Sequence, residues 1–140
     1  MPSRVELEAI TQRWIEVGWR QGNADMVLEL YAPDFVDFSS PFAERGTREQ
    51  NVEGIRALYR AFPDFHTEID DLVIDSEAGK VAVRWTATGT HRGDFLGLPP
   101  TGRQVIFHGI ETLKIAGGLI TERAGEWDGL EILEQISLPA

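Results

Sequence analysis

The most informative stretch of the chain covers residues 84–103 and reads RWTATGTHRGDFLGLPPTGR. As far as His91 it is rich in β-branched and aromatic residues and has no helical period, which predicts a strand over Lys80–His91. Glycines and the pair Pro99-Pro100 follow, and they predict a long loop over Gly93–Gly102 because such residues interrupt regular structure. A strand that leads into a long connection is therefore the first element that the sequence establishes.

Three further strands are predicted around this one, because the residues after Pro63 keep an extended rather than a helical period. Their expected ranges are Phe65–Asp75, Gln104–Ile115 and Leu119–Trp127. The segments that separate two of the strand pairs, residues 77–79 and 116–118, are short and contain glycine, as hairpin connections do. The second half of the chain is thus predicted to be a series of antiparallel strands.

The first residues of the chain carry a helical period instead. Ser3 and Glu6 have the spacing of a capping box, and the apolar residues after them predict a helix over Arg4–Arg20. Asn23 is expected to cap a short second helix, which ends at residues 32–34 because Pro33 disfavours a helical conformation in the residue before it. The apolar residues assigned to this second helix are Met26, Val27, Leu30 and Tyr31.

A short strand, a loop and a third helix are expected between the second helix and the sheet. Residues 35–46 predict the strand and the loop. Thr47 and Gln50 form a second capping box, and the helix that follows ends at Pro63. Its apolar residues are Val52, Ile55, Leu58, Tyr59 and Phe62.

Helices followed by a meandering sheet indicate an α+β fold, and 140 residues are enough for a single domain over residues 1–140. A sheet of long strands that only a few helices cover has to curl in order to bury one face. Its concave side then either fills with side chains or leaves a cavity.

The composition argues against several classes of function. A net charge of -10 disfavours nucleic acids and anionic membrane surfaces as partners. The chain has no cysteine, which excludes disulfides, thiolate metal sites and a cysteine nucleophile. It contains no apolar run of about 20 residues, the length that crosses a bilayer, and no secretory signal pattern at residues 1–6. The expected location is the cytoplasm.

Several segments resemble the SnoaL-like polyketide cyclases, a branch of the nuclear-transport-factor-2-like superfamily. Residues 84–103 are similar to the strand-and-loop signature of that family almost position by position. Supporting segments are residues 61–64, 109–111 and 127–130, with Leu133, Gln135 and Ile136. The resemblance covers roughly residues 25–137.

This resemblance implies a strongly bent mixed or antiparallel sheet that about three N-terminal helices wrap into a cone. It also implies an apolar small-molecule substrate or ligand in the cone, and a homodimer formed through the outer face of the sheet. Members and relatives include cyclases of aromatic polyketides, ketosteroid isomerases, limonene epoxide hydrolases and dehydratases, so the fold alone does not fix the activity. Proton transfer next to a carbonyl requires acids and bases only, so neither a metal nor an organic cofactor is expected.

Two acids are candidates for this proton transfer, because burial in an apolar pocket raises the pKa of a carboxyl group toward neutrality. Glu111 lies inside an apolar strand, and its position resembles that of the pocket aspartate of ketosteroid isomerases. Alternatively, it is a carboxylate at the edge of the cone that pairs with an arginine such as Arg123. Asp37 is the second candidate, in a stretch that is expected to enter the cone.

The last strand departs from the pattern of the cyclases. In those enzymes an acid/base aspartate follows the motif Glu-x-Trp, whereas here Gly125 occupies the expected position after Glu122. Asp128 is a third candidate catalytic acid, provided that the strand bulges near Gly125. The alternative role for Asp128 is to cap the final segment, Leu130–Ile136.

Aromatic residues are expected to form the wall of an apolar cavity. His91 follows the signature strand, where it either contacts the ligand or anchors the loop. By strand alternation, His108 points to the opposite face of the sheet from Glu111, and His66 is a surface residue. The predicted substrate-binding set comprises Trp14, Tyr31, Phe38, Tyr59, Phe62, Trp85, His91, Phe95, Arg123 and Trp127.

These observations support two main hypotheses. The first is a cofactor-independent enzyme of the polyketide cyclase or isomerase type, acting through Glu111, Asp37 or Asp128. The second is a non-catalytic binding or dimerisation module, because Gly125 stands where an acid is expected. A weaker third is an epoxide hydrolase-like or dehydratase activity. The hydrolase requires an Asp–Arg–Asp arrangement around a water, and the residue types are available in Arg84, Arg123, Asp37 and Asp128.

Overall fold

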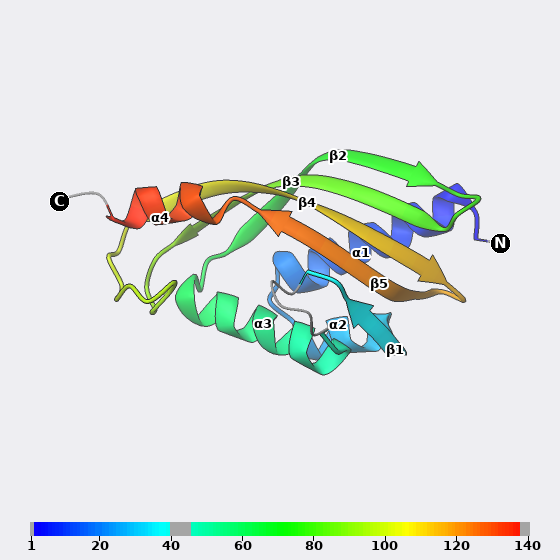
Figure 1. Cartoon of the computed structure of the whole chain (residues 1–140), viewed down its shortest axis with the longest axis horizontal. Helices are drawn as coiled ribbons and strands as arrows, with labels where there is room; N and C mark the ends of the chain where they lie inside the picture. The colour runs from blue at the N-terminus through cyan, green and yellow to red at the C-terminus, as the bar shows by residue number, and fades with distance from the viewer. Residues whose placement is uncertain (1, 40–45, 138–140) are drawn as a thin grey trace.

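In the computed structural model, which describes residues 2–39 and 46–137, helices form most of the first half and strands most of the second (Figure 1). The elements are α1 (Arg4–Trp19), α2 (Ala24–Leu30), β1 (Tyr31–Asp37), α3 (Arg48–Ala61), β2 (His66–Asp75), β3 (Lys80–Thr90), β4 (Gln104–Ala116), β5 (Leu119–Trp127) and α4 (Gly129–Ser137). The four long strands agree with the predicted ones to within one residue at each end.

The strands form one sheet in the order β1-β5-β4-β3-β2. β1 runs parallel to β5, and the other neighbouring strands are antiparallel. Figure 1 shows the long strands arching over α1, α2 and α3, while α4 lies beside one end of β4. The predicted α+β architecture with a curved mixed sheet is therefore confirmed.

Side-chain alternation gives the sheet one apolar face. On β3, Val81, Val83, Trp85 and Ala87 are buried, whereas Arg84 between them is exposed. β4 repeats this pattern, with its odd-numbered residues toward the helices and its even-numbered residues exposed. Because successive residues of a strand point to opposite faces, chemical groups for a cavity under the sheet have to come from the odd-numbered positions of these two strands.

Polar caps begin the first three helices as the sequence predicts. The side chain of Ser3 accepts a hydrogen bond from the backbone N of Glu6, and Asn23 caps α2 in the same way. Thr47 and Gln50 form a complete capping box at the start of α3. Such caps satisfy backbone N–H groups that have no partner within the helix, so each helix begins at a defined residue.

One predicted boundary is wrong, because Tyr31 begins β1 instead of ending the second helix. Ala32 precedes Pro33, which disfavours a helical conformation there, and Tyr31 itself is extended, with ψ of 141°. Tyr31 pairs with Ile120 of β5, and its ring stacks on Phe35 at 4.0 Å between centroids. Tyr31 is therefore held in the core by a strand.

Hydrogen bonds hold the signature stretch, residues 84–103, against the end of α3 and the residues that follow it. The carboxylate of Asp64 accepts hydrogen bonds from the backbone N and the Oγ1 of Thr90, both at 2.7 Å. The carbonyl of Ala61 accepts one from the backbone N of Gly93 at 3.1 Å. A Cβ at Gly93 would overlap the backbone of the last turn of α3, so only glycine fits this close approach.

The final helix, α4, completes the open edge of β4. Gln135 accepts a hydrogen bond from the backbone N of Ile106 at 2.8 Å and donates one to the carbonyl of Ile106 at 2.7 Å. Glu131 accepts from the backbone N of His108 at 3.2 Å. These side chains replace a neighbouring strand, because the ladder between β4 and β5 reaches only as far as Gly109 on β4.

Candidate functional site

A cavity of about 460 Å³ lies between α3 and the concave face of the sheet. This volume is in the range of about 300–1,000 Å³ that small-molecule sites occupy. Aromatic side chains form much of its wall, namely Trp19, Phe65, Trp85, Phe95, Phe107 and Trp127. The sequence left open whether side chains fill the concave side of the sheet or leave a cavity there, and the structure has a cavity.

A tight turn carries two apolar side chains to this cavity. Phe95 and Leu98 exchange backbone hydrogen bonds of 3.0 and 2.9 Å. Between them, Leu96 and Gly97 have φ of 52° and 76°, a left-handed conformation that residues other than glycine rarely adopt. Phe95 and Leu96 both line the cavity, so the turn gives the loop after β3 a defined place beside it.

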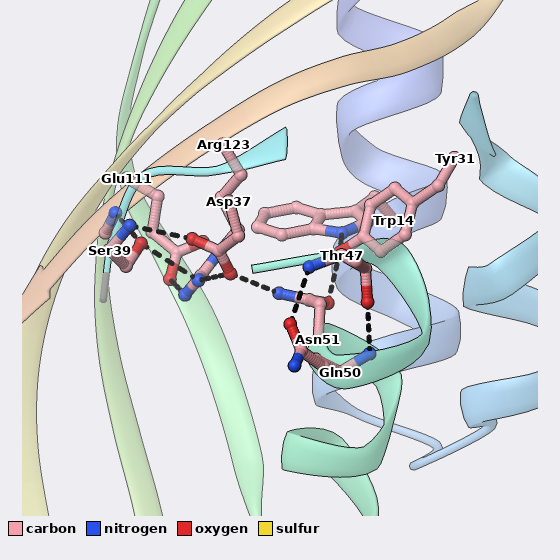
Figure 2. Close-up of polar contacts among 10 residues, drawn as sticks. Trp14, Tyr31, Asp37, Ser39, Thr47, Gln50, Asn51, Glu111 and Arg123 are labelled. Atoms are coloured by element: carbon pink, nitrogen blue, oxygen red, sulfur yellow. Dashed lines mark hydrogen bonds and ion pairs between the residues drawn. The ribbon is translucent and has the colours of Figure 1, made fainter. Parts of the chain in front are cut away.

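Within the cavity, Arg123 of β5 lies between two acids (Figure 2). Its Nη1 donates to Oδ2 of Asp37 at 2.8 Å, and its Nη2 donates to Oε1 of Glu111 at 2.6 Å. Only 13% of the Arg123 side chain, 12% of that of Asp37 and 5% of that of Glu111 are exposed. Glu111 therefore lines the cavity and is also paired with Arg123, as one of its two predicted alternatives has it.

The two acids differ in how fully their oxygens are occupied. Both oxygens of Glu111 accept from Arg123, because Nε donates to Oε2 at 3.1 Å in addition to the bond from Nη2. Oδ2 of Asp37 accepts from Arg123 and from Nδ2 of Asn51, the latter at 2.8 Å. Oδ1 of Asp37 accepts from the backbone N of Ser39 at 2.9 Å, and neither Arg123 nor Asn51 donates to this oxygen. Arg123 therefore occupies both oxygens of Glu111 but only one oxygen of Asp37.

One N–H group of Arg123 has no hydrogen-bond acceptor among the described residues. A guanidinium has five N–H groups, and the bonds to Asp37 and Glu111 use three of them. A fourth is used because Nη1 donates to Oγ of Ser39 at 3.1 Å. No acceptor for the second hydrogen of Nη2 occurs within residues 2–39 and 46–137. A ligand oxygen can take this place.

Charge in the cluster follows from burial and pairing. Burial acts to raise the pKa of Asp37, but Arg123 and hydrogen bonds from Ser39 and Asn51 outweigh it and hold the pKa below its usual value. Burial likewise opposes the charge of Arg123, but Glu111 and Asp37 hold its pKa above the usual range. Asp37 is therefore ionised at neutral pH, which the work of a base requires.

Gly125, where the cyclase pattern has an acid, lies directly beneath this ion pair. It pairs across the ladder with Glu111. A Cβ at this position would lie 2.8 Å from Nη2 of Arg123 and 2.9 Å from Oε1 of Glu111. The side chains of Arg123 and Glu111 thus occupy the space into which a residue at position 125 would project.

The structure brings together part of the predicted set. The cavity lining includes Asp37, Glu111, Trp85, Phe95, Arg123 and Trp127. Trp14, Tyr31, Phe62 and His91 are fully buried in the core and do not line the cavity. The hydroxyl of Tyr59 donates to the backbone carbonyl of Phe65 at 3.2 Å. Phe38 lines a separate hollow with Ala82 and Thr112.

Asp128, the third candidate acid, does not line the cavity. Its Oδ1 accepts from the backbone N of Glu131 at 2.9 Å, so it caps α4. Arg84, considered for a hydrolase, is exposed on the outer face of β3 and lies 3.9 Å from Asp70. Of the residues considered for that activity, Asp37 and Arg123 are the two that meet in the cavity.

The histidines have structural contacts. The Nδ1 of His91 lies 3.1 Å from Oγ1 of Thr101 and accepts from the backbone N of that residue, so the imidazole anchors the loop after β3. His108 is exposed and contacts Glu131 of α4. His66 is on the surface beside Glu68. The described residues contain no group of three or more His, Cys, Asp or Glu placed to hold a metal ion.

Two residues of the cluster were missed in the sequence, Asn51 and Ser39. Asn51 follows the capping box of α3 by one residue, and an asparagine inside a helix is unfavourable. That departure was the only available signal for Asn51. Ser39 accepts from the backbone N of Gly125 at 2.6 Å, a contact that depends on β1 lying beside β5 and that no sequence pattern indicates.

Known proteins are similar to this chain in sequence pattern and in fold. A family model described as SnoaL-like polyketide cyclase matches residues 9–136. No curated protein matches the chain in sequence. In the part of the chain that the structure describes, no helix has the length and apolar character of a membrane span.

Solved structures with this fold match over nearly their whole length. AclR, a proposed hydroxylase from Streptomyces galilaeus, is 26% identical with a TM-score of 0.87, over 98% of this chain and 100% of AclR. IdmH, a proposed polyketide cyclase from Streptomyces antibioticus, is 26% identical with a TM-score of 0.82, over 94% and 99%. A proposed cyclase from Acidithiobacillus ferrooxidans is 26% identical with a TM-score of 0.80, over 97% of both chains. Similar folds thus carry different named activities.

Proposed function

The chain belongs to the SnoaL-like polyketide cyclase family, and from this premise we propose that it is a cofactor-independent enzyme that transfers protons on an apolar carbonyl substrate. The observation that carries the proposal is the buried contact between Asp37 and Arg123 at the aromatic cavity. It places an ionised carboxylate beside a guanidinium, which are the two groups that enolisation of a ketone requires.

In the proposed reaction Asp37 is the base and Arg123 stabilises the oxyanion. Oδ1 of Asp37 removes a proton from the carbon next to the carbonyl, and the electron pair of that C–H bond forms the enolate. The free N–H of Arg123 donates to the enolate oxygen. For a cyclase, the enolate carbon then attacks a second carbonyl of the same substrate, and Asp37 returns its proton to the new alkoxide. One carboxylate serves both steps, so no acid at position 125 is needed.

Glu111 has a different part in this proposal. Its two oxygens both accept from Arg123, so it holds the guanidinium in place and balances its charge. This arrangement makes Glu111 a positioning residue instead of the first candidate for proton transfer that the sequence favoured. The aromatic wall accommodates the apolar body of the substrate.

The proposal is tested by exchange of the protons next to the carbonyl of 2-tetralone, a neutral bicyclic ketone, in D2O. Mass spectrometry would follow deuterium uptake. The wild-type protein should accelerate uptake, and Asp37→Asn should reduce the acceleration by about 10²–10⁴-fold, the usual contribution of a general base. Asp70→Asn, which changes an acid on β2 that contacts Thr86 instead of the cavity, is the matched control.

Glu111→Gln should slow exchange less than Asp37→Asn, because Arg123 keeps one carboxylate partner. Equal rates in the wild type, Asp37→Asn and Glu111→Gln would remove both acids from the mechanism. If 2-tetralone quenches the fluorescence of the cavity tryptophans but the wild type does not accelerate exchange, the protein is the non-catalytic binding module that the sequence left as the alternative.

A second candidate function is hydration of an apolar epoxide, which the Asp37–Arg123–Glu111 contact favours by placing an arginine between two acids. A carboxylate would take a proton from water, the water oxygen would attack one epoxide carbon, and an acid would protonate the opened oxygen. The lowered pKa of Asp37 keeps its carboxyl group ionised before the reaction begins, so Asp37 is not the acid of that last step and this function takes second place. Diol formation from cyclohexene oxide, followed by gas chromatography, separates the two.

We also propose a homodimer formed through the outer face of the sheet. Val73, Ile106 and Ile110 are on this face and are 60%, 49% and 47% exposed. Light scattering coupled to gel filtration should show a dimer for the wild type and a monomer for Ile110→Lys. The control is Leu130→Lys, which changes an exposed apolar residue of α4 and should remain dimeric. A monomeric wild type would contradict the proposal.

A further inference from the structure

A chain of hydrogen bonds reaches Asp37 from the core, and it begins at two residues that do not line the cavity. Nε1 of Trp14 on α1 donates to the hydroxyl oxygen of Tyr31 at 2.9 Å. That hydroxyl donates to Oδ1 of Asn51 on α3 at 2.6 Å. Nδ2 of Asn51 then donates to Oδ2 of Asp37 at 2.8 Å (Figure 2). Three elements thus contribute one continuous path.

The direction of this path is fixed by chemistry. An indole N–H can only donate, so the oxygen of Tyr31 accepts from Trp14 and its hydrogen goes to Asn51. Burial raises the pKa of the Tyr31 hydroxyl above its usual value, so the hydrogen stays in place at physiological pH. The amide of Asn51 therefore has its oxygen toward Tyr31 and its NH₂ group toward Asp37.

The opposite orientation of the amide is excluded on the same grounds. It would place the amide oxygen against the carboxylate of Asp37, where two acceptors meet without a hydrogen. The NH₂ group would then face the Tyr31 hydroxyl, whose own hydrogen would lose its acceptor. A buried polar group without a partner is destabilising, so one orientation dominates.

We propose that Trp14, Tyr31 and Asn51 are positioning residues that hold Asp37 with Oδ2 occupied and leave Oδ1 to the ligand. Trp14 and Tyr31 were predicted to contact substrate; in this proposal they act on the reaction through Asn51 instead. The inference rests on the proposed function, because it assigns these residues a task only if Asp37 is the base.

The capping box of α3 supports this assignment, because it fixes the turn that presents Asn51. The backbone N of Thr47 donates to Oε1 of Gln50 at 2.9 Å, and the backbone N of Gln50 donates to Oγ1 of Thr47 at 3.2 Å. Asp37 is held from its other side by two backbone hydrogen bonds of 2.9 Å to Gly46. The backbone on both sides of the Asn51–Asp37 contact is therefore fixed.

The test is a titration of the Asp37 carboxyl carbon by NMR, which needs no substrate. Removing a hydrogen bond to the ionised form of an acid raises its pKa, so Asn51→Leu should raise the pKa of Asp37 by about one unit. Tyr31→Phe should raise it in the same direction by a smaller amount, since Asn51 is then free to turn. Tyr59→Phe removes a hydroxyl outside the path and should leave the value unchanged.

A pKa of Asp37 that is the same in Tyr31→Phe and in the wild type would overturn the proposal. If Tyr31→Phe does not fold, as judged by circular dichroism, Trp14→Phe replaces it and carries the same expectation. A further readout is the side-chain NH₂ signal of Asn51, which should exchange faster with solvent in Tyr31→Phe than in Tyr59→Phe. Shifted pKa values without ketone exchange by the wild type would leave the path intact and refute the proposed function alone.

Discussion

At the scale of the single residue, Arg123 is the side chain on which the cluster depends, because it balances two buried carboxylates. Breaking a buried pair by removing one partner costs about 3–5 kcal/mol, and Arg123→Met should lower the free energy of unfolding in urea by this amount. Arg84→Met, on the exposed face of β3, should change it by about 0.5 kcal/mol or less. If the two changes lowered the free energy of unfolding equally, the buried ion pairs of Arg123 would contribute no more to stability than an exposed arginine does.

A second change refines this prediction. Combining Arg123→Met with Glu111→Leu removes one of the two carboxylates that the first change leaves unpaired. The double variant should therefore recover part of the lost stability, as apolar replacements of buried pairs commonly do. A double variant less stable than Arg123→Met would show that packing, and not charge, dominates at this place.

The pKa of Asp37 also predicts how stability depends on pH. Its folded-state value lies below the ordinary 3.8, so the unfolded chain binds a proton more readily than the folded protein does. The stabilisation by ionised Asp37 is complete at pH values above the pKa of this group in the unfolded chain. It is lost as the pH falls through 3.8 toward the lower pKa of the folded state. The stability difference between the wild type and Asp37→Asn should therefore shrink below about pH 4.

Urea unfolding of both proteins between pH 3 and pH 7 measures this difference directly. Carboxyl groups remote from the cluster contribute equally to the two proteins and cancel. A difference that stays constant over the whole range would mean that Asp37 has the same affinity for protons in the folded and unfolded states.

At this scale, a place at the cavity could be predicted for residues whose neighbours along the chain carry the signal. Glu111 stood out as an acid in an apolar strand, and Asp37 as an acid in a segment bound for the cone. Ser39 and Asn51 gave no comparable signal, because their contacts join β1, β5 and α3. The role of Gly125 also depends on its partner across the ladder, Glu111.

At the scale of the element, α4 serves as a substitute for a strand beside β4. If Gln135 satisfies the backbone of Ile106, then Gln135→Ala should expose that N–H to solvent. Its amide should exchange about tenfold faster, which corresponds to roughly 1.4 kcal/mol and to the loss of a typical hydrogen bond. Hydrogen exchange followed by NMR gives the rate for each residue.

The amide of Phe107 is the internal control for this measurement. N–H groups alternate in direction along an antiparallel strand, so that amide faces β3, where Phe107 pairs with Ala87. Its exchange should not change in Gln135→Ala. Faster exchange at both amides would indicate that the whole end of β4 unfolds, and that α4 does more than complete one edge.

Elements with a clear period and clear ends could be predicted from the sequence, and those fixed by distant partners could not. The capping residues and hairpin turns are local signals, and α3 and the long strands agree with them. Tyr31 continued the helical pattern of α2, but pairing with Ile120 of β5 places it in a parallel strand. No local pattern indicates that a strand from the first half of the chain will lie beside the last one.

At the scale of the whole molecule, the sheet bends far enough that its concave face cannot be filled by the helices alone. α3 covers part of it, and Gly54 contributes no side chain at the wall of the cavity. A hollow of this kind costs stability, because the surrounding side chains lose contacts that close packing would provide. Proteins commonly retain such a cost where a ligand has to enter.

Gly54 makes this trade-off measurable in the intact protein. It lies inside α3, and a Cβ at this position would have no atom within 4 Å. Because glycine in a helix interior is less favourable than alanine by about 1 kcal/mol, Gly54→Ala should raise the free energy of unfolding by up to that amount.

Gly54→Phe should instead project a ring into the cavity and weaken the binding of 2-tetralone, measured by quenching of the cavity tryptophans. Gly54→Ala is the matched control for the change of backbone preference, since its methyl group is too small to fill the space. If Gly54→Phe bound the ketone as tightly as Gly54→Ala, the ligand would occupy another part of the molecule, and the cavity under the sheet would not be the site of the reaction.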